Sequence, residues 1–141
     1  MTNHFDRAVQ VTQCVQKTAG IPVVWGGIHP TVRPEECLQY ADVVCIGEGE
    51  SSIVELAARI DNGEGRRNIP GIWAKDSQGI IKNPLPPLIQ DLDALPFPDY
   101  DCDTNYILRG QDFLRLSADV FAIEAADYHT LCTRGCPHNC A

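Results

Sequence analysis

The last eleven residues, LCTRGCPHNCA, hold three of the seven cysteines in the chain. Cys136 and Cys140 are separated by three residues, and Gly135 and Pro137 flank the first of them. This spacing holds two thiolates on a tight loop, with the span that two irons of a cubane cluster present. Glycine permits the unusual backbone angles and proline stiffens the turn. A zinc site or unpaired thiols are the alternatives, although zinc sites more often use Cys-x2-Cys pairs and need four ligands.

The terminal sequence resembles the Cys-x3-Cys-x2-Cys motif of the radical S-adenosylmethionine (SAM) family, often preceded by Arg-Gly, as Cys136 is here. Cys136 and Cys140 fit the first two cysteines, and the third would fall at the second position beyond Ala141. We interpret Cys132 as a strand residue, because the family commonly has a small or hydroxylated residue there. The resemblance implies that Cys136 and Cys140 are two of three ligands to a [4Fe-4S] cluster, which binds SAM and cleaves it reductively.

The other four cysteines need no special role. Cys14 and Cys37 fall in predicted helices and Cys45 in a predicted strand, where buried free thiols are common. Cys102 lies in a polar loop, and no function is assigned to it.

Two glycine loops upstream are placed where they could bind a ligand. Residues 26–31 (GGIHPT) follow a predicted buried strand at 21–25, and residues 47–50 (GEGE) follow another at 41–46. The spacing of apolar residues predicts helices at residues 5–19, 34–40 and 51–60. This order predicts part of a doubly wound α/β layer, in which ligands bind at the carboxyl ends of the strands.

The two loops together, VVWGGIHPTVRPEE and ADVVCIGEGESSIVEL, resemble the cobalamin-binding domain found ahead of radical SAM barrels. The resemblance covers about residues 1–60. It implies that Gly26 and Gly27 leave room for the nucleotide tail of cobalamin. It also implies that the backbone of Gly47 and Glu48 contacts the corrin amides.

The N-terminal residues extend this resemblance. Thr2 and Asn3 match a Thr-Asn pair that often follows an earlier strand near the corrin. That strand's serine, and any Asp-x-His-x-x-Gly signature with a histidine ligand for cobalt, would lie upstream of Met1. His29 sits in the wrong loop for that ligand, so we predict a capping or packing role for it.

The middle of the chain predicts a hairpin and a connector between domains. Runs at 69–75 and 79–82 predict a hairpin outside the parallel sheet. Residues 83–101 contain five of the ten prolines and cannot be helical throughout. We interpret this segment as an interdomain linker.

The remaining sequence predicts the start of a second domain. A short helix is expected at 106–116, and strand propensity returns at 120–123 and 128–133, just before the cysteines. The expected fold is thus an incomplete flavodoxin/Rossmann-like parallel sheet, a small hairpin and linker, and the first strand of a β/α barrel. The expected domains are the C-terminal part of a cobalamin-binding domain, the hairpin with its linker, and the start of a radical SAM domain, at residues 1–62, 63–102 and 103–141.

Composition limits the partners and the location of the protein. The chain has 141 residues and a net charge of −8, so nucleic-acid or anionic-membrane binding has no electrostatic support. No apolar run is long enough to span a bilayer and no signal peptide is visible, so we expect a cytoplasmic protein. Two strands cannot complete an open sheet, so we expect that an N-terminal portion is missing.

These features predict a fragment of a cobalamin-dependent radical SAM enzyme. The parent would be a methyltransferase or a cyclase that acts on an unactivated carbon, with a small-molecule substrate and an electron donor as partners. The fragment by itself is expected to be inactive. The alternatives are a stand-alone cobalamin-binding module without catalysis, in which the terminal cysteines are incidental, and a zinc-dependent regulatory protein.

Overall fold

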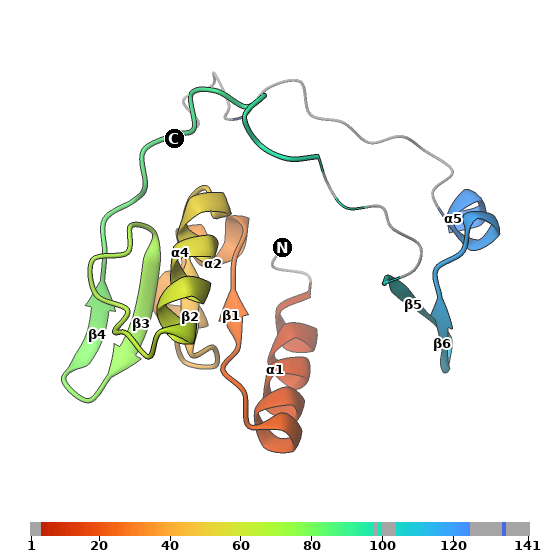
Figure 1. Cartoon of the computed structure of the whole chain (residues 1–141). Coiled ribbons are helices and arrows are strands. Elements are labelled where there is room, and N and C mark those ends of the chain that lie inside the picture. Colours follow the sequence, from red (N-terminus) through yellow and green to blue (C-terminus); the bar gives the residue numbers. More distant parts are fainter. Residues whose placement is uncertain (1–3, 98, 100–103, 125–133, 135–141) are drawn as a thin grey trace, which may run out of the picture. The chain divides into compact units, whose positions relative to one another are not determined.

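The computed structural model describes residues 4–97, 99, 104–124 and 134. The chain divides into two compact units, Met1–Leu92 and Asp93–Ala141. Among the described residues, the first unit has a four-stranded sheet with helices on both faces, and the second has a two-stranded hairpin and a short helix (Figure 1). The predicted α/β class is confirmed. Within the described ranges, no helix is both long and apolar enough to cross a membrane.

The sheet of the first unit is mixed. Its strands lie in the order β1 (Val24–Trp25), β2 (Val43–Cys45), β3 (Ile72–Asp76) and β4 (Gly79–Lys82). β1 and β2 are parallel, whereas β2 with β3 and β3 with β4 are antiparallel. The predicted hairpin therefore exists, but its predicted position outside the parallel sheet is wrong. The physical reason is burial, since Ile72 and Ala74 of β3 are fully buried in one cluster with Val43 of β2.

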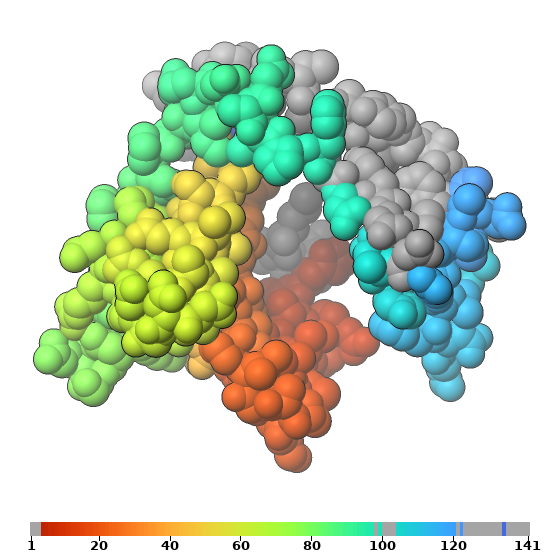
Figure 2. All heavy atoms as spheres, in the orientation of Figure 1, coloured from red at the N-terminus to blue at the C-terminus, as the bar shows by residue number. Residues whose placement is uncertain are grey.

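Helices cover both faces of this sheet. They are α1 (Phe5–Ala19), α2 (Ile28–Val32), α3 (Pro34–Cys37) and α4 (Glu50–Asp61). On one face Val43 and Cys45 pack with Leu56 of α4, and Figure 2 shows α4, in yellow, covering that side. On the other face Val44 packs with Leu38, beside α1 and α3. The alternation along β2 thus sends successive side chains into two separate cores.

The helices at 5–19 and 51–60 are confirmed, with α4 one residue longer at each end. Two local predictions differ from the structure. Part of the expected loop at 26–31 folds as α2, in which the Thr31 N–H donates to the Gly27 carbonyl at 3.1 Å. The expected helix at 34–40 ends at Cys37 and continues as a turn.

The second unit corrects two further predictions. The helix expected at 106–116 is a hairpin of β5 (Tyr106–Arg109) and β6 (Asp112–Arg115), because Gly110 turns the chain with φ of 64°. The strand expected at 120–123 is helix α5 (Ala118–Glu124). The Val120 N–H donates to Ser117 Oγ at 3.2 Å, which caps its first turn.

The last predicted strand, at 128–133, lies outside the described residues, so the barrel start stays a prediction. Along the sequence, the boundary between the two compact units falls after Leu92, inside the segment predicted as hairpin and linker. The proposed division at 62 and 102 also stays a prediction.

Candidate functional site

Two glycine loops lie at one edge of the first sheet. Gly26 and Gly27 follow β1, and Gly47 follows the end of β2. Because β1 and β2 are parallel, their carboxyl ends share this edge. The predicted meeting of both loops at the carboxyl ends of the strands is confirmed.

Gly27 keeps part of this edge free of side chains. It precedes α2 with φ of 99°, a conformation that side-chain-bearing residues rarely adopt. A Cβ atom added there would meet no other atom within 4 Å. A larger residue would therefore be strained and would project into open space that glycine leaves accessible.

The hydroxyl of Thr31 joins the two loops. Thr31 Oγ1 donates to the Gly27 carbonyl at 2.8 Å and accepts from the Gly47 N–H at 3.1 Å. One side chain thus fixes the spacing between the loops after β1 and β2. The sequence alone did not single out this residue, although its place in GGIHPT, four residues after Gly27, fits a helix back-bond.

A cavity of about 290 Å³ opens beside Gly26. Phe5, Trp25 and His29 contribute to its walls. The Phe5 ring packs edge-on against both neighbours, with centroid distances of 5.6 Å to Trp25 and 5.1 Å to His29. Trp25 Nε1 also donates to Thr12 Oγ1 at 2.8 Å, which fixes the indole. The cavity therefore has a preformed lining in which aromatic rings and aliphatic side chains such as Val24 alternate with a glycine.

His29 has a packing position in this structure. Only 8% of the residue is exposed, and Nε2 lies 3.9 Å from Glu36 Oε2. Its ring contact with Phe5 agrees with the packing role predicted from the sequence.

The second glycine loop contacts a distant segment of the chain. The Gly47 backbone has φ of 75°, and an added Cβ would lie 3.0 Å from Leu85 Cδ2. Glu48 Oε2 accepts a hydrogen bond from the Ile89 N–H at 2.7 Å. The sequence did not predict these contacts, because they join residues about forty positions apart.

The described cysteines are free thiols. Cys37 and Cys45 are buried, and burial raises the pKa of both thiols, so they favour the protonated form. Cys14 is exposed on α1, so the expectation of a buried thiol is wrong for this residue. Among the residues that the structure describes, no group of three His, Cys, Asp or Glu side chains could hold a metal ion.

Four predicted site residues lie outside the described residues: Thr2, Asn3, Cys136 and Cys140. Their roles stay predictions. The structure brings together Gly26, Gly27 and Gly47, with Glu48 next in the chain.

Comparison with known families matches residues 1–57 to the B12 binding domain. Residues 1–57 are a B12-binding domain. The match includes both glycine loops, and it confirms the resemblance to a cobalamin-binding domain expected over about residues 1–60. The aromatic cavity and the open space above Gly27 lie within this B12-binding domain.

Two relatives are similar to the chain beyond this domain. An uncharacterized methyltransferase of Pyrococcus horikoshii is 32% identical over 122 residues, which are 84% of this chain and 24% of the relative. The anaerobic magnesium-protoporphyrin IX monomethyl ester cyclase of Synechocystis is 30% identical over 82 residues, which are 56% of this chain and 16% of the cyclase. The chain thus spans about a quarter or less of either relative's length.

The residues of the B12-binding domain fit a cobalamin ligand. Large cofactors with many amides need exposed backbone and a concave, partly apolar wall. The loops at Gly27 and Gly47 supply backbone at the strand ends, and the cavity beside Gly26 supplies the wall. The Thr31 bridge holds these parts together without occupying the open side of Gly27.

Proposed function

We propose that the B12-binding domain holds cobalamin along the edge formed by Gly26, Gly27, Gly47 and Glu48. The observation that carries this proposal is the Thr31 bridge, which fixes both loops as one surface beside an aromatic cavity. In this arrangement the nucleotide tail lies over Gly26 and Gly27, where side chains would obstruct it. The backbone of Gly47 and Glu48 faces the corrin amides.

We assign Thr2 and Asn3 to the same site. They directly precede His4 and Phe5, and both of these residues line the cavity beside Gly26. A polar pair at this position would orient the corrin by hydrogen bonds.

We further propose that the domain serves a cobalamin-dependent radical SAM enzyme. The support is the terminal motif together with relatives named as a methyltransferase and a cyclase. Cys136 and Cys140 would hold two positions of a [4Fe-4S] cluster, with a small-molecule substrate and an electron donor as partners. When bound, these cofactors would supply SAM cleavage and methyl transfer or ring formation at an unactivated carbon.

Titration of the purified chain with hydroxocobalamin, followed by visible absorption and calorimetry, tests the binding site. Gly26→Val should weaken binding by about tenfold or more, which corresponds to about 1.4 kcal/mol. The added Cβ itself makes only an ordinary 3.8 Å contact with Cys45, and circular dichroism of the variant checks that the domain stays folded.

Gly65→Val is the matched control, because Gly65 has no positive φ and an added Cβ there meets nothing within 4 Å. Equal affinities of the two variants would contradict the proposed site.

Anaerobic iron–sulfur reconstitution tests the enzymatic part. The readout is the iron bound per chain, because Cys136 and Cys140 would be two ligands of the cluster. Cys136→Ala should lower the bound iron, whereas Cys132→Ala should not. Equal iron content in both variants would favour a cobalamin-binding module without catalysis, and zinc in aerobically purified protein would favour a zinc site.

A further inference from the structure

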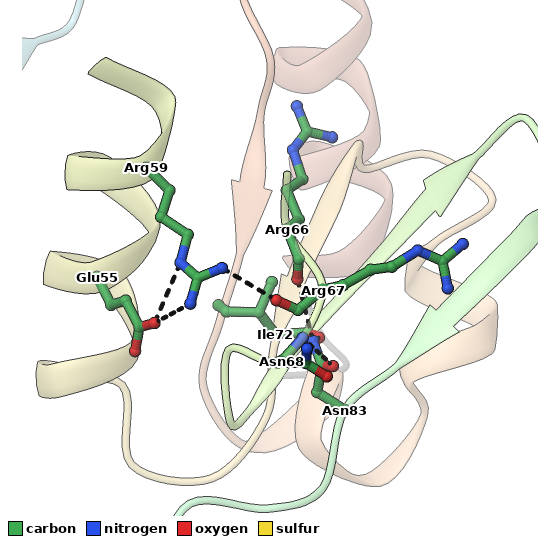
Figure 3. A network of polar contacts seen from close by, with 7 residues as sticks. All are labelled: Glu55, Arg59, Arg66, Arg67, Asn68, Ile72 and Asn83. Carbon is green, nitrogen blue, oxygen red and sulfur yellow. Dashed lines mark hydrogen bonds and ion pairs between the residues drawn. The ribbon is translucent and has the colours of Figure 1, made fainter. Parts of the chain in front are cut away.

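Residues 83–89 form an extended segment after β4, which we call the strap. It begins at Asn83, which is only 8% exposed. Asn83 Nδ2 donates to the Ile72 carbonyl at 2.6 Å and to the Arg66 carbonyl at 3.2 Å, and Oδ1 accepts from the Asn68 N–H at 3.0 Å (Figure 3). The start of the strap is therefore anchored to two other segments.

The strap then meets the end of the central strand. The Pro84 carbonyl accepts from the Gly71 N–H at 2.7 Å, and the Gly71 carbonyl accepts from the Ile46 N–H at 2.8 Å. A Cβ added at Gly71 would lie 2.9 Å from the Ile46 oxygen and 3.1 Å from Pro86 Cδ. Glycine at 71 thus permits the strap to approach the carboxyl end of β2.

The strap next contacts the second glycine loop. Leu85 and Pro86 lie over Gly47, where an added Cβ would be 3.0 Å and 3.4 Å from their side-chain atoms. The Ile89 N–H donates to Glu48 Oε2 at 2.7 Å. Contacts at both ends of the strap thus fix its course along the edge of the sheet.

The composition of the strap suits a preformed wall. Three of its seven residues are prolines, which fix φ and lower the entropy lost on ordering. Leu85 is nonetheless 61% exposed, although it lies beside a loop that we propose to face the corrin. An apolar side chain in this position can cover the apolar periphery of a bound corrin.

We infer that the strap completes one wall of the cobalamin cleft, with Leu85 as the contact residue and Glu48 as the residue that positions it. This inference rests on the proposed cobalamin site and extends it beyond the B12-binding domain at residues 1–57. The Glu48 backbone then faces the cofactor while its carboxylate holds Ile89.

The first experiment tests the hydrogen bond between Glu48 and Ile89 independently of cobalamin binding. In the chain without cobalamin, Glu48→Ala should speed hydrogen exchange of the Ile89 amide by about tenfold. Glu48→Gln should restore slow exchange, because an amide oxygen accepts the same bond. Glu64→Ala, a change of an exposed glutamate that follows α4, should leave the exchange unchanged.

Hydroxocobalamin titration then tests the wall. Leu85→Ala and Glu48→Ala should each weaken binding by about threefold or more. Glu48→Gln should bind hydroxocobalamin as tightly as the unsubstituted chain does. Leu108→Ala is the matched control, because Leu108 is 62% exposed and lies in the second unit.

Unchanged Ile89 exchange in Glu48→Ala would overturn the positioning role of Glu48. Parent-like affinity of Leu85→Ala would overturn the wall. Failure of the unsubstituted chain to bind hydroxocobalamin would instead overturn both the proposed function and the wall. The exchange result would still decide the role of Glu48.

Discussion

The Thr31 hydroxyl accepts a hydrogen bond from the Gly47 N–H at 3.1 Å across the carboxyl edge of the parallel strands. The same oxygen donates to the Gly27 carbonyl at 2.8 Å. A single hydroxyl therefore connects the two loops and sets the distance between them. The B12-binding domain presents both loops as one surface for this reason.

Replacing Thr31 by valine should loosen this surface. Thr31→Val keeps the β-branched shape and removes the hydroxyl, so the Gly47 N–H loses its protein partner. We expect the free energy of unfolding in urea to fall by about 0.5–1.5 kcal/mol, together with weaker hydroxocobalamin binding. Thr31→Ser keeps the hydroxyl and should retain both properties. Equal stability and affinity of the two variants would show that the bridge is not needed.

Replacing Asn83 by alanine should destabilise the fold more than Thr31→Val does. The change removes three hydrogen bonds to the main chain and leaves the Asn68 N–H and the Ile72 carbonyl without this partner. We expect the free energy of unfolding in urea to fall by about 2–3 kcal/mol, because buried polar groups are costly to leave unsatisfied. Asn62→Ala at the end of α4 is the control and should cost much less. A similar loss in both variants would contradict the anchoring role of Asn83.

The ion pair between Glu35 and Lys82 should give a pH-dependent contact between α3 and β4. Lys82 Nζ lies 2.9 Å from Glu35 Oε1, and this hydrogen bond, with the backbone N–H of Glu35, holds the pKa of that carboxyl below its ordinary value. A lowered folded-state pKa means that the contribution to stability is present at neutral pH. It is lost as the pH falls through the lowered pKa.

Lys82→Met should therefore move the Glu35 pKa back toward its ordinary value, as measured by NMR titration of the side-chain carboxyl. Lys75→Met removes another exposed lysine and should leave that pKa in place. An unchanged Glu35 pKa in Lys82→Met would refute the assigned cause.

Local sequence signals predicted the elements that hold the glycine loops. Helical spacing gave the correct start and end of the first helix, and the β-branched runs located β1 and β2. The same signals failed for residues 106–116, where the positive φ of Gly110 outweighs helical spacing. They failed again at 120–123, where the Ser117 cap begins a helix in a run with strand propensity. In both places a turn or capping residue was visible in the sequence and carried more weight than the apolar pattern.

The contacts around the site depend on residues far apart in the chain. The Glu48 bond to Ile89 and the packing of Leu85 over Gly47 join segments that are separated along the chain by β3 and β4. The sequence predicted both strands of that hairpin, but not the antiparallel pairing of β3 with β2. Long-range pairing of this kind leaves no local periodicity from which it could be predicted.

Asn83 also affects how the surrounding loop can evolve. The described hydrogen bonds of its side chain all reach main-chain atoms, those of Arg66, Asn68 and Ile72. The anchor therefore does not depend on which side chains the loop carries, except at Asn68, where φ of 63° favours asparagine, aspartate or glycine. Apart from buried Ile69 and from Gly71, which has no room for a side chain, substitutions can accumulate in the loop between α4 and β3 while Asn83 stays fixed, so sequence drift there can proceed without moving the edge of the sheet.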